Sequence, residues 1–145
     1  MLYLDYKRYQ LKYLEAQEAV NAILDEKTVL FQKTQPKSAI SETERVDGGT
    51  RVNKVEEYVI ALEQRHINER LAEAKTLMLE RKDLLNHKEA ELRASQSIDD
   101  IIYVLKWLDG MKTKDIIDEI AYSETQVYRI IKKIRKNLKM VVNDK

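Results

Sequence analysis

Apolar side chains recur at alternating spacings of three and four from about residue 2 to residue 33. This spacing places them on one stripe of an α-helix, and no Gly or Pro interrupts the segment. The stripe consists of Tyr6, Tyr9, Tyr13, Ala16, Val20, Ile23, Lys27 and Leu30. Only the lysine breaks its apolar character. We therefore predict one long amphipathic helix over residues 2–33.

A second periodic stretch, from about residue 53 to residue 93, predicts another long helix. Its stripe contains Ile67, Leu71, Ala74, Met78, Leu85 and Leu92, with Arg81 and Lys88 interrupting. Residues 34–52 contain the only Pro and two of the three Gly and have no apolar periodicity, which predicts a flexible linker. Because neither helix can bury its stripe alone, we expect residues 1–93 to form a long helical hairpin or coiled-coil arm. The same need predicts a homo-oligomer, a dimer or tetramer, assembled through this arm.

Shorter periodic segments follow the arm. Apolar positions over residues 98–109 predict a short helix that ends at Gly110, and Ser97 with Asp100 has the spacing of a capping box at its start. This is the first of three helices that we expect in a small domain over residues 97–145.

The other two helices of this domain are predicted at residues 113–120 and 124–140. Ser123 is the expected N-cap of the last helix, and Gln126 completes a capping box three residues later. Together with the arm, these segments predict an all-α fold with a C-terminal trihelical domain.

Composition agrees with helices and excludes several classes of protein. The chain has one Pro, three Gly and no Cys, so it has no disulfide framework, thiolate metal site or thiol nucleophile. The first residues are charged throughout, and no run is apolar enough to span a membrane. We expect a cytoplasmic protein that does not contact membranes.

Positive charge is concentrated near the C-terminus, although the formal net charge is only +1. From residue 111 to residue 145 there are nine Lys or Arg against five Asp or Glu. Residues 128–140 contain six cations and no acid. A cluster of this kind suits the phosphates of a nucleic acid.

The last predicted helix has two distinct faces. Its apolar residues Val127, Ile130, Ile131, Ile134 and Leu138 share one face, which we expect to bury against Ile116 and Ile120. The opposite face then points outward, with polar residues at its start and cations further along. In a helix-turn-helix, such a helix lies in the major groove, and a short helix before it crosses the phosphates.

We therefore predict that helix 124–140 reads double-stranded DNA in the major groove. Arg can bind guanine, Gln can pair with adenine, and Lys can contact phosphate. The predicted DNA-binding residues are Lys112, Lys114, Ser123, Thr125, Gln126, Tyr128, Arg129, Lys132, Lys133 and Lys136.

The segment MKTKDIIDEIAYSETQVYRIIKKIRKNL, residues 111–138, resembles the last helix-turn-helix of sigma factors, their region 4. The layout of the whole chain resembles small phage regulators of the RinA and ArpU type, which activate late or packaging genes. This resemblance implies a sequence-specific transcriptional regulator, an activator of such genes, in the bacterial host cytoplasm, with host RNA polymerase as a further partner.

Two positions depart from the pattern of that family. Ile117 stands where the family usually has a small residue, and Ala121 stands at the usual turn glycine. A left-handed Ala costs roughly 1 kcal/mol, so we expect this turn to take another geometry.

Other functions remain as alternatives. A small terminase subunit of a phage would also combine DNA recognition with assembling helices, and a coiled-coil scaffold that does not bind DNA would explain residues 1–93. Glu63 and His66 have the E-x-x-H spacing of di-iron bundles, but no second such pair is present. No nucleophile or phosphate-loop motif occurs, so we expect no enzyme, no cofactor and no metal.

Overall fold

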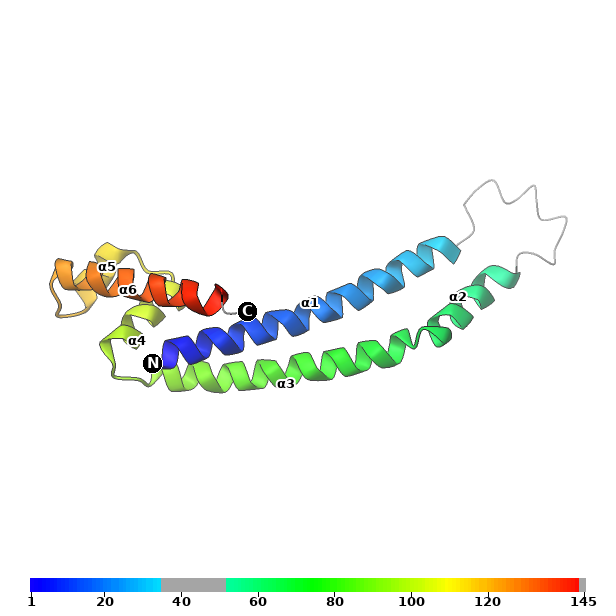
Figure 1. The fold of residues 1–145 in the computed structure, drawn as a ribbon, viewed down its shortest axis with the longest axis horizontal. Helices are drawn as coiled ribbons and strands as arrows, with labels where there is room; N and C mark the ends of the chain where they lie inside the picture. Colours follow the sequence, from blue (N-terminus) through cyan, green and yellow to red (C-terminus); the bar gives the residue numbers. More distant parts are fainter. Residues whose placement is uncertain (35–51, 144–145) are drawn as a thin grey trace. The chain divides into compact units, whose positions relative to one another are not determined.

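In the computed structural model, which describes residues 1–34 and 52–143, every regular element is helical. The elements are α1 (Leu2–Thr34), α2 (Val52–Gln64), α3 (Ile67–Arg93), α4 (Ile98–Tyr103), η3 (Val104–Leu108), α5 (Thr113–Glu119) and α6 (Glu124–Asn143) (Figure 1). The predicted all-α class is confirmed. The predicted linker, residues 34–52, lies almost entirely outside the described residues. None of the described helices is long and apolar enough to cross a membrane.

The helices group into two compact units. Unit 1 contains Met1–Leu14 and Glu80–Lys145, and unit 2 contains Glu15–Leu79. The predicted boundary between an arm and a domain, near residue 93, does not coincide with this grouping. The start of α1 and the end of α3 pack with the short C-terminal helices, because their apolar side chains share one core with them.

The apolar stripe predicted for the first helix is the inward face of α1. Ala16, Val20 and Leu30 are buried, and even Lys27 is half-buried. The stripe of α3 behaves in the same way, with Ile67 and Leu71 buried in unit 2. The spacing of three and four therefore identified the buried faces of both helices correctly.

Polar and aromatic contacts show that α1 runs antiparallel to the α2 and α3 segments of unit 2. Arg70 Nη2 lies 3.0 Å from Glu26 Oε2, and the Phe31 ring meets the Tyr58 ring edge-on at 5.3 Å between centroids. As the residue number along α1 rises from 26 to 31, the residue number of the contact partner falls from 70 to 58, so the two segments run in opposite directions. The stripes thus find partners within the chain, so their burial no longer requires a second copy.

The second long helix is interrupted, contrary to the prediction of one helix over residues 53–93. His66 has a φ of 51°, in the left-handed region, and it separates α2 from α3. The side chain of Arg70 donates a hydrogen bond to the Arg65 carbonyl at 3.3 Å and also binds Glu26. This arginine therefore satisfies a free carbonyl at the break, which helical periodicity cannot reveal.

Unit 1 is built around one apolar core. The core contains Tyr3, Tyr6, Leu85, Leu92, Ile102, Tyr103, Val104, Ile116, Val127, Ile131 and Ile134. The Tyr103 ring stacks between the rings of Tyr3 and Trp107, at 5.4 Å from each centroid. Tyr3 and Tyr6 therefore anchor the start of α1 in this core, and Tyr9 and Tyr13 pack against it.

The first short helix changes geometry before it ends. Its second half, η3, is a π-helix in which the Asp109 amide donates to the Val104 carbonyl at 2.9 Å. Gly110 follows with a φ of 72°, so the predicted end of the helix is confirmed. Arg93, at the end of α3, binds Asp109 at 3.2 Å, and this hydrogen bond raises the pKa of the guanidinium.

The capping box predicted at Ser97 and Asp100 does not form. Ser97 is the N-cap of α4 by its backbone, but its side chain makes no capping hydrogen bond. Asp100 is buried and accepts hydrogen bonds from the Ser95 hydroxyl at 2.7 Å and from the Tyr3 amide at 3.1 Å. The prediction was wrong because a local motif cannot anticipate a partner 97 residues away.

Candidate nucleic-acid interface

Helix α6 has one buried face and one exposed face. Val127, Ile131 and Ile134 are buried in the core of unit 1, and Ile116 from α5 is fully buried in the same cluster. The packing predicted between these apolar faces is therefore present. Since the core takes one side of α6, the residues on the opposite side point to solvent.

All ten residues predicted to bind DNA are exposed. Thr125, Arg129, Lys132 and Lys136 follow one another along the exposed face of α6, at spacings of four, three and four. A rigid helix thus presents them as one row.

The start of α6 is capped as predicted. The Ser123 amide donates to Gln126 Oε1 at 3.2 Å, and the Gln126 amide donates to Ser123 Oγ at 3.3 Å. These reciprocal bonds satisfy two backbone donors that the first helical turn leaves free. They also occupy the amide oxygen of Gln126, which a bidentate contact with adenine would need.

The turn between α5 and α6 avoids the left-handed region. Ile120 is extended at the end of α5, with φ −110° and ψ 148°. Among the described residues, His66 is the only non-glycine residue with a positive φ, so Ala121 is not in the left-handed region and is not strained. The expectation that this turn takes another geometry is confirmed.

Five cations on the exposed side of α6 have no hydrogen bond or ion pair to another described residue. We call them the unpaired cation set: Arg129, Lys132, Arg135, Lys136 and Lys139. The only acid on α6 is Glu124, in its first turn, where it suits the helix dipole. The field of this face is therefore positive and is not neutralised within the helix.

Two members of this set, Arg135 and Lys139, were absent from the predicted site. Both belong to the basic run over residues 128–140, and both are exposed. At 100° per residue they lie on the flank next to Lys132, so helical geometry could have found them.

Lys133 differs from the other cations of α6. Its Nζ lies 2.9 Å from Oδ2 of Asp99 on α4, whose side chain is only 14% exposed. The hydrogen bond to Asp99 raises the pKa of Lys133. This lysine therefore joins α6 to α4, and its charge is balanced within the protein.

The two predicted cations before and within α5 are exposed, but α5 itself is not basic. Lys112 is the backbone N-cap of α5, and Lys114 lies in its first turn. Asp115, Asp118 and Glu119 are exposed on the same helix. Positive charge is thus concentrated on α6, whereas α5 carries one Lys against three acids and has a formal charge of −2.

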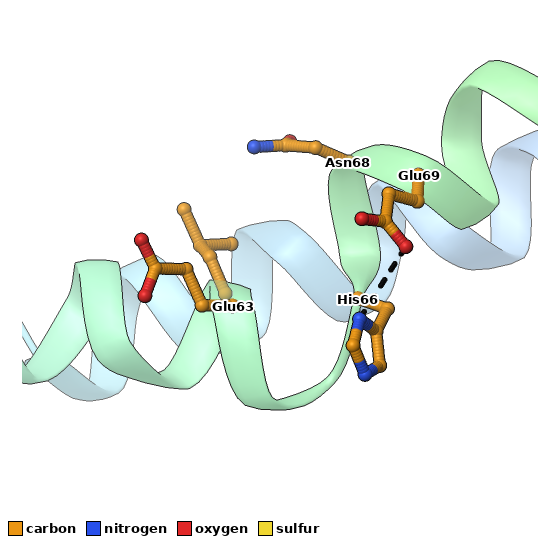
Figure 2. Close-up of a pocket in the computed structure, with 5 residues that line it drawn as sticks. Glu63, His66, Asn68 and Glu69 are labelled. Carbon is orange, nitrogen blue, oxygen red and sulfur yellow. Dashed lines mark ion pairs between the residues drawn. The ribbon is translucent and has the colours of Figure 1, made fainter.

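A separate hollow in unit 2 contains the E-x-x-H pair noted in the sequence. It is lined by Leu62, Glu63, His66, Asn68 and Glu69. Figure 2 shows that the Glu63 carboxylate points away from the imidazole, whose Nδ1 lies 3.4 Å from Glu69. Among the described residues, no three His, Asp or Glu side chains gather to hold a metal ion. An exposed ion pair such as His66 with Glu69 contributes little to the stability of the fold.

Comparison with protein-family models, with curated proteins and with solved structures gave no match to this chain.

Proposed function

We propose that this protein binds double-stranded DNA in a sequence-specific manner and regulates transcription, with no catalytic step of its own. The observation that carries the proposal is the unpaired cation set on the exposed face of α6. Arg and Lys contacts to phosphate dominate DNA affinity, and a helix with a polar start can reach base edges.

In this proposal, α5 and α6 form a helix-turn-helix. The short α5 lies over the phosphate backbone, and α6 enters the major groove with its N-terminal turns toward the bases. Thr125 and Arg129 then face base edges, while Lys132 and Lys136 contact phosphates. Packing of α5 against α6 through Ile116 and Val127 supports this interpretation, because a buried apolar seam holds the two helices at a constant angle.

Activation of phage late or packaging genes, with RNA polymerase as a partner, rests on the sequence resemblance alone. A small terminase subunit is the second candidate, and the mass in solution separates the two. A dimer or tetramer fits a regulator, and a closed ring of eight or more chains fits a terminase subunit.

The test is selection of duplexes from a random DNA library with the purified full chain. We expect one enriched motif, against which variants are then measured. Arg129→Ala should relax the sequence preference at one base pair and reduce the binding free energy by roughly 1 to 3 kcal/mol. Lys136→Ala should weaken binding to all sequences by a similar factor. Lys75→Ala is the matched control, because Lys75 is an exposed cation of α3 in unit 2. Failure to enrich any sequence, with Arg129→Ala binding like the parent, contradicts the proposal.

A further inference from the structure

Tyr3, near the start of the chain, makes three different contacts with the C-terminal helices of unit 1. Its hydroxyl accepts a hydrogen bond from Asn137 Nδ2 of α6 at 2.9 Å. Its backbone amide donates to Asp100 of α4 at 3.1 Å, and its ring stacks on Tyr103 at 5.4 Å. Tyr3 is fully buried, and its bond to Asp100 is buried with it, whereas the bond to Asn137 is part-buried.

The hydrogen bond from the Tyr3 amide to Asp100 gives each of these two polar groups a partner. Tyr3 lies in the first turn of α1, whose amides have no acceptor within the helix. A carboxylate there also faces the positive end of the helix dipole. Asp100 itself is only 3% exposed, and a buried carboxylate is costly unless it accepts hydrogen bonds. The start of α1 and the first short helix of the C-terminal third thus depend on each other.

The contact with Asn137 extends this dependence to α6. Apolar side chains hold α6 along most of its length: Val127, Ile131 and Ile134 are buried in the core, Leu138 packs against the core, and Val141 is buried. Asn137 follows directly after Lys136 and lies in the C-terminal half of α6. The hydrogen bond to Tyr3 therefore adds a directional polar restraint to this half of the helix, next to the residues of the cation row.

We propose that the DNA-binding unit is discontinuous in sequence and that Tyr3 is a positioning residue that holds α6 in its binding orientation. This inference rests on the proposed function, because the orientation matters only if α6 enters a groove. The first turn of α1 is then part of the DNA-binding fold. Residues 97–145 alone lack the acceptor and the stacking partner that this fold uses.

The test uses the full chain and removes only the hydroxyl group. Tyr3→Phe keeps the ring stack and the backbone bond to Asp100. If the lost bond lowers the fraction of molecules with α6 correctly oriented, the affinity for the selected duplex falls by the same factor. The strength of one neutral hydrogen bond limits this loss to roughly 2- to 10-fold. The salt dependence should stay unchanged, because no cation has been removed.

Two further variants make the measurement specific. Asn137→Ala should weaken binding as Tyr3→Phe does, and the double variant should lose no more than either single one. Tyr13→Phe is the matched control, because Tyr13 is another tyrosine of α1 and its hydroxyl makes no hydrogen bond within the described residues. All affinities are compared at a temperature where circular dichroism shows each variant fully folded.

Amide hydrogen exchange separates this inference from the proposed function. Faster exchange over residues 133–143 in Tyr3→Phe, with α5 unchanged, supports the positioning role even if no duplex is bound. In that case it is the DNA-binding proposal that fails. If Tyr3→Phe binds the duplex like the parent and exchange in α6 is unaltered, Tyr3 does not position α6.

Discussion

The charge balance between Lys133 and Asp99 can be tested by removing both charges together. The double variant combines Asp99→Asn and Lys133→Gln and therefore keeps the net charge. We compare its DNA binding with that of the single variant Lys136→Gln. Lys133 lies 2.9 Å from a carboxylate that is 14% exposed, whereas Lys136 has no partner among the described residues. We expect the double variant to bind DNA like the parent, because the pair contributes no free charge.

The expected magnitudes follow from counterion release. Each phosphate contact adds about −0.9 to the slope of log K against log salt. Because Arg129 faces the bases in the proposed function, the other four members of the unpaired cation set allow a slope of about −3.6 per chain. Lys136→Gln should reduce this to about −2.7 and weaken binding about fivefold near 0.15 M salt. The double variant should keep the slope of the parent. Asp99→Asn alone frees Lys133 and should steepen the slope to about −4.5.

The assay is fluorescence anisotropy of a labelled duplex over a series of salt concentrations, with circular dichroism to confirm folding. Lys75→Gln, outside unit 1, is the control for a change of net charge alone. A slope as shallow in the double variant as in Lys136→Gln would refute the reasoning. It would mean that Lys133 leaves Asp99 in the complex and contacts a phosphate itself.

Three further predictions concern stability and assembly. Burial raises the pKa of the Tyr103 hydroxyl above its value in the unfolded chain. The stabilisation that the neutral hydroxyl contributes is therefore present below pH 10 and falls as the pH rises above the unfolded-state pKa of this tyrosine. Denaturant titrations should show that the free energy of unfolding falls less at alkaline pH in Tyr103→Phe than in the parent. Ser123→Ala removes the cap of α6 and should lower the free energy of unfolding by about 1 kcal/mol, measured by urea denaturation, with Ser97→Ala nearly neutral. If the chain assembles into a dimer or tetramer, the exposed apolar residues Val59 and Ile60 of α2 are the surface we expect to mediate it, and replacing both with Gln should reduce the mass in sedimentation. A parent chain that sediments as a monomer at micromolar concentration contradicts this last prediction.

Local sequence determined the helices of this protein and their buried faces. The stripe of α1, the end of the first short helix at Gly110, and the cap formed by Ser123 and Gln126 all depend on residues within a few positions of each other. Such features follow from 3.6 residues per turn and from backbone groups that local side chains satisfy. For the same reason, the exposure of the α6 cations could be predicted once its apolar face was known.

Only the tertiary structure decided which polar groups are free and which are already bound. Asp100 has the spacing of a local cap, yet it binds Tyr3, 97 residues earlier in the chain. Lys133 belongs to the basic run, yet Asp99 balances its charge across two helices. His66 interrupts a periodic helix where Arg70 binds Glu26, 44 residues earlier in the chain, as well as the nearby carbonyl of Arg65. In each case the partner lies on another turn or another helix, so the hydrogen bond exists only after packing has brought the two groups together.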